Sequence, residues 1–227
     1  MARIRLAVFD VAGTTAKDDG LVVQAFQDAI SAAGYSGSEI EEMTKYVNAT
    51  MGQRKMDVFL HLCVGNETKA QAMHEDFVDA YNSLITRGYL HEFDGVPELF
   101  ARLRMEGIGI AITTGFPRQI LDRIIEGLHW EEKIDISVAA SEVPYGRPAP
   151  DMVLRAIEIF NEKFSEDINP LDVAVIGDTP SDMGTGKSAR VAYVVGVTSG
   201  DFDRDALFAA GATQVLDFAT LLLEVVN

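Results

Sequence analysis

Short apolar segments alternate with segments of helical periodicity from residue 96 onward, and this alternation limits the possible folds more than any other feature. The segments expected to form strands are Ile108–Thr113, Ile136–Ala139, Val173–Ile176, Ala192–Val197 and Thr213–Leu216. The segments expected to form helices are Val96–Glu106, Arg118–Leu128, Asp151–Phe160, Asp182–Ala189, Arg204–Ala210 and a final helix at the C-terminus. Strands that alternate with helices predict an α/β fold, a doubly wound, Rossmann-like parallel sheet covered by helices on both faces.

The β-rich segment Arg3–Phe9 belongs with this set, because it is short, apolar and followed by a turn cluster. Residues 17–90 show helical spacing, so we expect no strand there. The helices expected in this region are Leu21–Ala33, Glu39–Val47, Arg54–Cys63 and Thr68–Arg87, with Ser38 and Asn66 placed to begin two of them. We therefore predict a core domain of residues 1–16 and 91–227, with a helical cap domain of residues 17–90 inserted after the first strand.

The charge balance restricts the partners. The chain has 19 Lys and Arg residues against 35 Asp and Glu, a net charge of −16, which disfavours nucleic acid and anionic membrane surfaces. We expect a small-molecule ligand instead. The single cysteine, Cys63, cannot form an intrachain disulfide, and no apolar run has the length of a membrane span or the pattern of a signal peptide. These features predict a cytoplasmic protein.

Polar residues follow several of the expected strands. In a sheet of this kind ligands bind beyond the carboxyl ends of the strands. That rule selects Asp10, Thr113-Thr114-Gly115, the segment Ser141–Arg147 and the segment Gly177–Asp182 as the candidate site.

Two of these segments have the composition of a phosphoryl and metal site. Asp10 is followed by Gly13-Thr14-Thr15, whose flexible backbone, amides and hydroxyls suit a phosphoryl group beside a carboxylate. Asp178 and Asp182 supply the hard oxygen ligands that Mg²⁺ prefers. Each residue taken singly also has a purely structural interpretation. Asp10 could be a polar residue in the turn that ends a strand, and Asp182 could stabilise the first turn of a helix through the helix dipole.

In this order the segments resemble the motifs of the haloacid dehalogenase (HAD) superfamily of phosphoryl-transfer enzymes, over the whole chain. Asp10-Val11-Ala12-Gly13-Thr14 matches the first motif, Thr113 the second, Arg147 the third, and Asp178 with Asp182 the fourth. The resemblance implies that Asp10 is the nucleophile and that Thr113 and Arg147 are catalytic. It further implies a Mg²⁺ cofactor. The metal residues implied are Asp10, the Ala12 carbonyl, Asp178 and Asp182, and the phosphate-binding residues are Ala12, Gly13, Thr14, Thr114 and Gly115.

Ala12 is the main departure from the superfamily pattern. Its phosphatases carry an acid at this position, which protonates the leaving alkoxide, whereas alanine has no proton to donate. An enzyme that cleaves phosphate esters would lose a general acid worth about 10²–10⁴ in rate. Either the protein is impaired, or its leaving group needs no such proton.

The phosphonatase-like hydrolases of this superfamily fit the second possibility. Ala12-Gly13-Thr14-Thr15, Arg147 in place of Lys, and Met51-Gly52-Gln53-Arg54-Lys55 are similar to segments of phosphonatase, which cleaves a carbon–phosphorus bond. The resemblance implies that Lys55 forms a Schiff base with an aldehyde substrate, phosphonoacetaldehyde or a related 2-oxoalkylphosphonate. The resulting imine accepts electrons as the bond breaks, so no alkoxide leaves. The alternative is that Lys55 is an exposed lysine near the start of a helix.

The resemblance is incomplete at two positions. Phosphonatase has a proton-transferring His soon after its lysine, but Met56-Asp57-Val58 follow Lys55, and His61 is assigned no role. Phe116 stands where phosphonatase has Tyr. The resemblance also implies a homodimer through the cap. Two alternatives stay open, namely a small-molecule phosphatase of the phosphoglycolate type and a catalytically silent binding domain.

Overall fold

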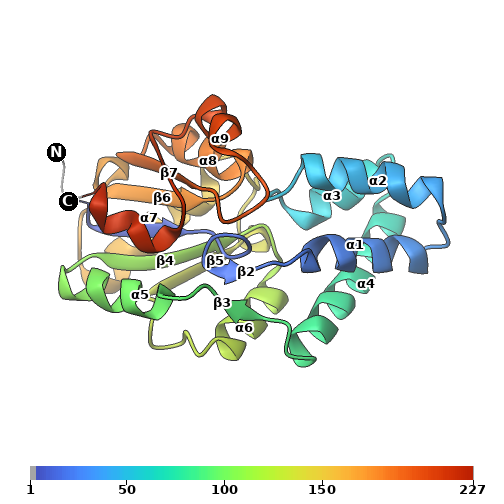
Figure 1. Ribbon diagram of the computed structural model, residues 1–227, viewed down its shortest axis with the longest axis horizontal. Coiled ribbons are helices and arrows are strands. Elements are labelled where there is room, and N and C mark those ends of the chain that lie inside the picture. The colour runs from blue at the N-terminus through green and yellow to red at the C-terminus, as the bar shows by residue number, and fades with distance from the viewer. Residues whose placement is uncertain (1–3, 227) are drawn as a thin grey trace.

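The computed structural model describes residues 4–226, and its centre is a parallel sheet of six strands in the order β5-β4-β1-β6-β7-β8 (Figure 1). The strands are β1 Leu6–Phe9, β4 Gly109–Thr114, β5 Ile136–Ala139, β6 Val173–Gly177, β7 Tyr193–Val197 and β8 Gln214–Leu216. From β1 the chain winds through β4 to the edge strand β5, and then returns to β6 on the other side of β1. The predicted α/β fold with a doubly wound parallel sheet is confirmed.

The first strand is shorter than predicted. Arg3 lies outside the described residues, and Ile4 and Arg5 precede the strand. All four residues of β1 are buried, and the two faces alternate. Leu6 and Val8 pack against the α7 side, whereas Ala7 and Phe9 pack against the α5 side. This burial on both faces explains why the sequence of β1 is continuously apolar.

Helices cover both faces of the sheet. The core helices are α5 Val96–Met105, α6 Arg118–Gly127, α7 Asp151–Phe164, α8 Pro180–Ala189 and α9 Arg204–Ala210. Helix α7 extends beyond the predicted end at Phe160, and the ring of Phe164 packs 4.9 Å from that of Phe160. The predicted C-terminal helix is a 3₁₀ helix, η3 Ala219–Glu224, which packs beside α5.

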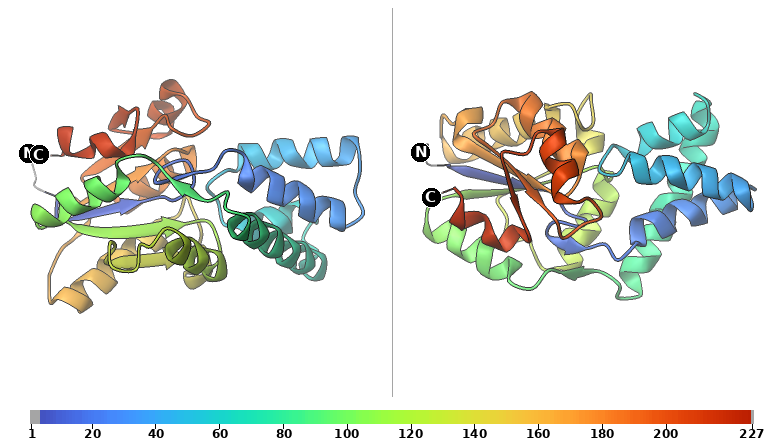
Figure 2. Two further views of the ribbon diagram at one scale, coloured as in Figure 1. Left: turned by 60° about the horizontal axis from the view of Figure 1, so that its bottom comes forward. Right: turned by 45° about the horizontal axis from the view of Figure 1, so that its top comes forward.

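Four helices form a separate layer beside the carboxyl ends of the strands (Figures 1 and 2). They are α1 Leu21–Ala32, α2 Ser38–Ala49, α3 Lys55–Leu62 and α4 Glu67–Thr86. Ser38 is the first residue of α2, and the Asn66 side chain caps α4 by accepting a hydrogen bond from the Lys69 N–H at 3.1 Å. The aromatic rings of Phe26, Phe59 and Phe77 pack together between α1, α3 and α4.

The two chain segments that connect this helical layer to the sheet pair with each other as short strands. Strand β2, Ala16–Lys17, is antiparallel to β3, His91–Glu92. Helical spacing did not predict β2, because two residues are too few to show a strand period. The predicted boundaries at 16/17 and 90/91 fall at this hinge, and the division into domains stays a prediction.

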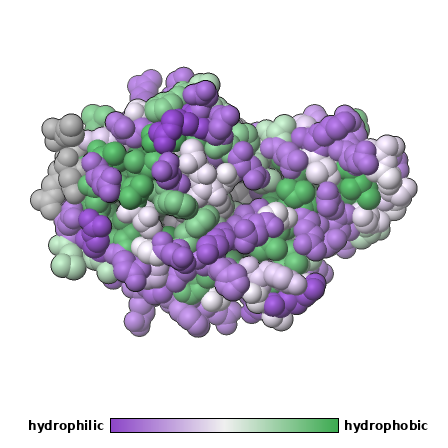
Figure 3. Space-filling model, in the orientation of Figure 1, coloured by the Kyte–Doolittle hydropathy of each residue, from purple (hydrophilic) through white to green (hydrophobic). Residues whose placement is uncertain are grey.

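The surface agrees with the acidic composition. Hydrophilic residues cover much of the face in Figure 3, with apolar residues in smaller groups between them. Within residues 4–226, no helix combines the length and apolar character that crossing a membrane requires.

Candidate active site

Four buried side chains meet at the carboxyl ends of β1, β4 and β6. The Arg147 guanidinium donates hydrogen bonds to Asp10 Oδ1 at 2.6 Å and to Thr113 Oγ1 at 2.8 Å. Its Nη1 also lies 2.7 Å from Asp182 Oδ1. Arg147 itself follows the loop after β5, so tertiary structure brings together residues separated by more than a hundred positions in sequence. The opposite charges hold Asp10 in one orientation at the end of its strand.

Three carboxylates converge at the same place. One oxygen each from Asp10, Asp178 and Asp182 lies within 4.8 Å of the others. Burial and the neighbouring charges of Asp10 and Asp182 raise the pKa of Asp178 well above its ordinary value. Burial likewise raises the pKa of Asp182 to about 6, against the opposing effect of Arg147. Three buried acids at this spacing repel one another, and a divalent cation would relieve that repulsion.

Glycines leave room around Asp178. Gly13 has φ +79°, and a Cβ there would lie 2.4 Å from Asp178 Oδ2. A Cβ on Gly200 would lie 2.0 Å from the same oxygen. The Thr14 hydroxyl donates to Asp178 Oδ1 at 2.9 Å, which holds the carboxylate in place. Hard oxygen donors, burial and this space fit a magnesium ion.

Asp182 differs from the other two acids in its contacts. Its Oδ2 accepts hydrogen bonds from the Thr179 hydroxyl at 2.6 Å and the Thr179 N–H at 3.1 Å, at the start of α8. Its Oδ1 pairs with Arg147. Both oxygens are thus engaged by the protein, so Asp10 and Asp178 are the acids with more freedom to bind a cation.

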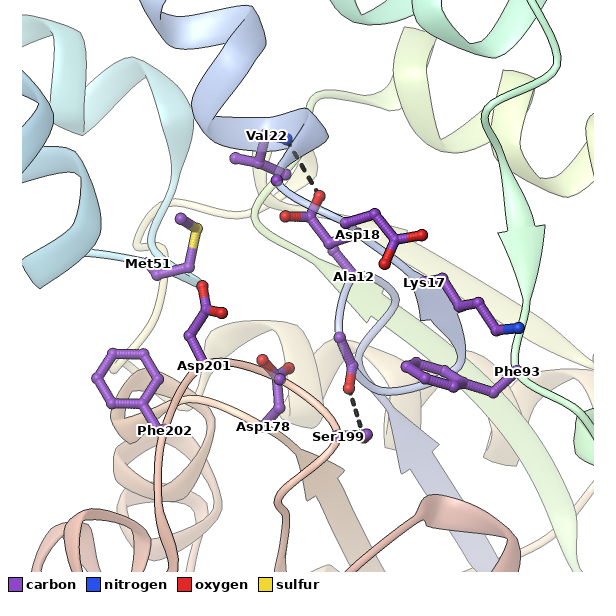
Figure 4. A pocket seen from close by; sticks show the side chains of 14 residues that line it. Ala12, Lys17, Asp18, Val22, Met51, Phe93, Asp178, Ser199, Asp201 and Phe202 are labelled. Carbon is purple, nitrogen blue, oxygen red and sulfur yellow. Dashed lines mark hydrogen bonds between the residues drawn. The ribbon is translucent and has the colours of Figure 1, made fainter.

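A cavity of about 460 Å³ opens beside Asp178 (Figure 4). Ala12 and Gly13 line its core side, and Asp18 and Met51 line its cap side. The Ala12 side chain carries no polar group toward this cavity, as its residue type requires.

Lys55 is the first residue of α3 and is buried, with 4% of its surface exposed. Its Nζ lies 5.2 Å from the centre of the Phe116 ring and 5.9 Å from that of Phe26. Within residues 4–226, no hydrogen bond or ion pair to Nζ is observed. Burial lowers the pKa of Lys55 to about 8, while the charges of Asp10 and Asp18 oppose this effect. The alternative of an exposed lysine is wrong.

The loop that precedes Lys55 is inserted between core segments. A Cβ on Gly115 would lie 2.3 Å from the Gln53 carbonyl oxygen, and the Gly115 carbonyl accepts a hydrogen bond from the Lys55 N–H at 3.1 Å. The Ser181 hydroxyl donates to the Met51 carbonyl at 2.9 Å. These contacts place Lys55 at a defined position over the strand ends.

Thr114, a predicted phosphate-binding residue, and His61, to which no role is assigned, both have structural contacts. Thr114 is buried, and its Oγ1 accepts a hydrogen bond from the Phe116 N–H at 3.3 Å, so it supports the turn. His61 stacks on Tyr46 at 3.9 Å between centroids, within the cap. No sequence pattern selects Asp18, which lines the cavity because the hinge directs the chain past it into α1.

Comparison with known proteins agrees with this architecture. The model of the haloacid dehalogenase-like hydrolases matches residues 4–190. A phosphonoacetaldehyde hydrolase from Bacillus cereus is 32% identical over 218 residues, which cover 87% of this chain and 77% of that protein.

Two solved structures show the same fold at low identity. A phosphonoacetaldehyde hydrolase-like protein from Oleispira antarctica superposes with a TM-score of 0.81 at 20% identity, over 100% of this chain and 92% of that one. A predicted phosphoglycolate phosphatase from Haemophilus somnus superposes with a TM-score of 0.78 at 17% identity, over 100% of both chains. The chain therefore belongs to the haloacid dehalogenase-like hydrolases and is a phosphonatase-like member of that superfamily.

Proposed function

We propose that this hydrolase cleaves the carbon–phosphorus bond of phosphonoacetaldehyde or a related 2-oxoalkylphosphonate, with Mg²⁺ as cofactor. The observation that carries the proposal is Lys55, a buried amine held over the strand ends beside a site in which Ala12 replaces an acid. The amine explains how a leaving group can depart without a protonating residue at position 12.

The core residues act on phosphorus. Asp10 attacks it to form an aspartyl phosphate, which water then hydrolyses. Arg147 and Thr113, hydrogen-bonded at 2.8 Å, orient Asp10 and bind the phosphoryl oxygens. Asp10, the Ala12 carbonyl and Asp178 would hold Mg²⁺, which when bound neutralises the charge of the phosphoryl group and of the acids around it.

Lys55 acts on the carbonyl carbon. Its neutral amine condenses with the aldehyde, releasing water and leaving a protonated imine. When the carbon–phosphorus bond breaks, its electron pair moves into the imine and yields an enamine. The pKa of about 8 supports this role, because an appreciable fraction of the amine is neutral near pH 7 to 8.

The experiment combines turnover with trapping. Lys55→Arg keeps the charge but cannot form an imine, so we expect phosphate release from phosphonoacetaldehyde to be lost. Borohydride with substrate should reduce the wild-type imine to a stable adduct, which mass spectrometry should locate on Lys55. In Asp10→Asn the adduct should still form, whereas phosphate release should fall by roughly 10⁴-fold, because an amide is a poor nucleophile.

Lys45→Arg is the matched control, since Lys45 is exposed and pairs with Glu42 on α2. Its activity should equal that of the wild type. If Lys55→Arg cleaves phosphonoacetaldehyde well, or if the adduct lies on another lysine, the Schiff-base mechanism is wrong. Release of phosphate from esters such as phosphoglycolate, undiminished in Lys55→Arg, would then favour the alternative of a small-molecule phosphatase.

Absence of turnover on every phosphonate and ester, in the presence of Mg²⁺, would favour a silent binding domain. The homodimer through the cap and the cytoplasmic location stay predictions, and sedimentation of the purified protein tests the first of them.

A further inference from the structure

Arg54 directly precedes α3 of the helical layer, and its side chain forms hydrogen bonds with the core. Its Nη1 donates to the Pro144 carbonyl at 3.1 Å, and its Nη2 donates to the Val143 carbonyl. Both carbonyls belong to the loop between β5 and α7, which also contains Arg147. The neighbour of Lys55 in the chain is therefore bonded to the loop that carries the arginine proposed to bind the phosphoryl group.

The backbones of the two segments are also in close contact. A Cβ on Gly146, the residue before Arg147, would lie 2.7 Å from the Arg54 Cβ and 3.4 Å from the Arg54 backbone nitrogen. A side chain at this position would displace one of the two segments, so a glycine is needed here. The next residue, Lys55, donates its backbone N–H to the Gly115 carbonyl at 3.1 Å. The start of α3 is thus held against the loops that follow β4 and β5.

The Arg54 guanidinium is engaged by protein groups. Both of its terminal nitrogens donate to backbone carbonyls, and its Nε lies 4.0 Å from Asp57 Oδ2, one turn along α3. The side chain is mostly buried, with 19% of its surface exposed. A planar fork that donates to two successive carbonyls fixes both the distance and the angle between the segments that it joins. These contacts suit Arg54 for positioning other groups rather than for binding a substrate.

The loop continues from these carbonyls to the catalytic centre. Two residues separate Pro144 from Arg147. The Arg147 guanidinium donates to the carboxylate of Asp10, the proposed nucleophile, at 2.6 Å. A displacement of the loop at Pro144 is therefore transmitted over a short stretch of chain to the group that orients Asp10.

The proposed substrate makes the separation between Lys55 and this centre critical. In a 2-oxoalkylphosphonate, a single carbon lies between the phosphorus and the carbonyl carbon. Asp10 must attack the phosphorus and Lys55 the carbonyl carbon of one bound molecule, so the two side chains need a fixed separation. Misplacement of a reacting group by about 1 Å can lower the rate by about 10²-fold.

We propose that Arg54 is a positioning residue, which holds the Lys55 amine at the distance from the phosphoryl site that a 2-oxoalkylphosphonate spans. The inference rests on the proposed function, because it concerns the formation of the same imine. It predicts that Arg54 affects imine formation with an aldehyde that carries a phosphonate, but not with an aldehyde that lacks one.

The experiment compares two aldehydes with the purified protein and Mg²⁺. Borohydride trapping with phosphonoacetaldehyde requires the correct separation of Lys55 from the phosphoryl site, whereas trapping with acetaldehyde, which has no phosphonate, requires only the amine. Mass spectrometry measures the rate of adduct formation on Lys55 in each case. In Arg54→Gln, we expect the ratio of the phosphonoacetaldehyde rate to the acetaldehyde rate to fall by about 10²-fold, and kcat/KM for phosphonoacetaldehyde to fall equally.

A purely structural role of Arg54 would give a different pattern. Loss of folding, or a change in the protonation of Lys55, would lower both trapping rates together and leave their ratio unchanged. Arg54→Lys keeps the positive charge but replaces the planar fork with a single ammonium group, so we expect it to restore only part of the ratio. Full restoration by lysine would show that only the charge matters, and would overturn the proposal.

Arg87→Gln is the matched control. Arg87 is an exposed arginine at the end of α4, and its Nη2 donates to the Tyr89 hydroxyl at 3.4 Å rather than to the core loop. Both trapping rates and their ratio should equal those of the wild type. A fall in this ratio as large as that in Arg54→Gln would contradict a specific role for Arg54.

Failure of the proposed function and failure of this inference are distinguishable. If the wild type releases no phosphate from phosphonoacetaldehyde and borohydride traps no adduct on Lys55, both are wrong. If the wild type does both, but Arg54→Gln keeps the wild-type ratio of trapping rates, only the role of Arg54 is wrong.

Discussion

The core and the cap differ in the surroundings of their buried cationic side chains. At the strand ends, Arg147 has a partner on each side, with Asp10 at 2.6 Å and Asp182 at 2.7 Å. In the cap, Lys55 is equally buried, but its Nζ lies over the rings of Phe116, at 5.2 Å, and Phe26, at 5.9 Å. In the proposed function, this difference gives one site two kinds of chemistry. Paired charges stay ionised and would bind a phosphoryl group, whereas an amine among aromatic rings loses its proton more easily and would act as the nucleophile.

The largest effect should come from the acids of the core. We expect Asp178→Asn to lower kcat/KM by roughly 10³-fold at a fixed Mg²⁺ concentration, because stabilisation of several kcal/mol by the metal is lost. Without metal, the same variant should be more stable than the wild type, since one of three repelling carboxylates becomes neutral. Thermal unfolding with EDTA and with Mg²⁺ measures both effects.

The wild type should gain stability when Mg²⁺ is added, and Asp178→Asn should gain much less. An equal gain in both proteins would show that the cation binds elsewhere.

The unpaired lysine of the cap should lower stability. Its pKa falls from 10.5 to about 8 on folding, which corresponds to a cost of roughly 3 kcal/mol below pH 8. The folded state binds this proton more weakly than the unfolded state, so the cost is fully present at pH 7 and disappears as pH rises from 8 to 10.5. Lys55→Met should therefore be inactive yet more stable at pH 7, by up to about 3 kcal/mol.

Urea unfolding at pH 7 and pH 10 checks this prediction, and the advantage of Lys55→Met should shrink at the higher pH. Lys45→Met, at an exposed position of α2, serves as the control and should have no such pH dependence. If Lys55→Met is less stable than the wild type at pH 7, the lysine has a stabilising partner.

The smallest effect concerns the contact between the two regions. Gly52 has φ +83°, and a Cβ there would lie 2.5 Å from Thr179 Oγ1 of the core. We expect Gly52→Ala to lower kcat/KM by about tenfold, because the displaced loop moves Lys55 from its position. Gly65 has φ +78° with open space around it, so Gly65→Ala shares the backbone strain without the contact.

Both variants should lose about 1 kcal/mol of folding stability, measured by urea unfolding, from the left-handed backbone. Only Gly52→Ala should lose activity with phosphonoacetaldehyde. Equal activities would contradict the view that docking of this loop positions the lysine.

The hinge illustrates what local patterns miss. The change in the periodicity of the chain predicts domain boundaries near residues 16 and 91, and that division stays a prediction. The pairing of β2 with β3 could not be predicted, since two-residue strands have no measurable period and their partners lie far apart in sequence. The C-terminal segment was expected to be an α-helix, but it is the 3₁₀ helix Ala219–Glu224. A short apolar run does not distinguish between the two.

The sequence by itself determined the α/β class, the helical insertion and the acids at the strand ends. These depend on periodicity and on the rule that parallel strands end at one edge, and both are local properties of the chain. Only the tertiary structure decided that Asp182 pairs with Arg147, that Lys55 is buried against Phe116, and that Asp18 faces the cavity. Each of these depends on distances between segments remote in sequence, and burial and charge coupling follow from those distances rather than from residue type.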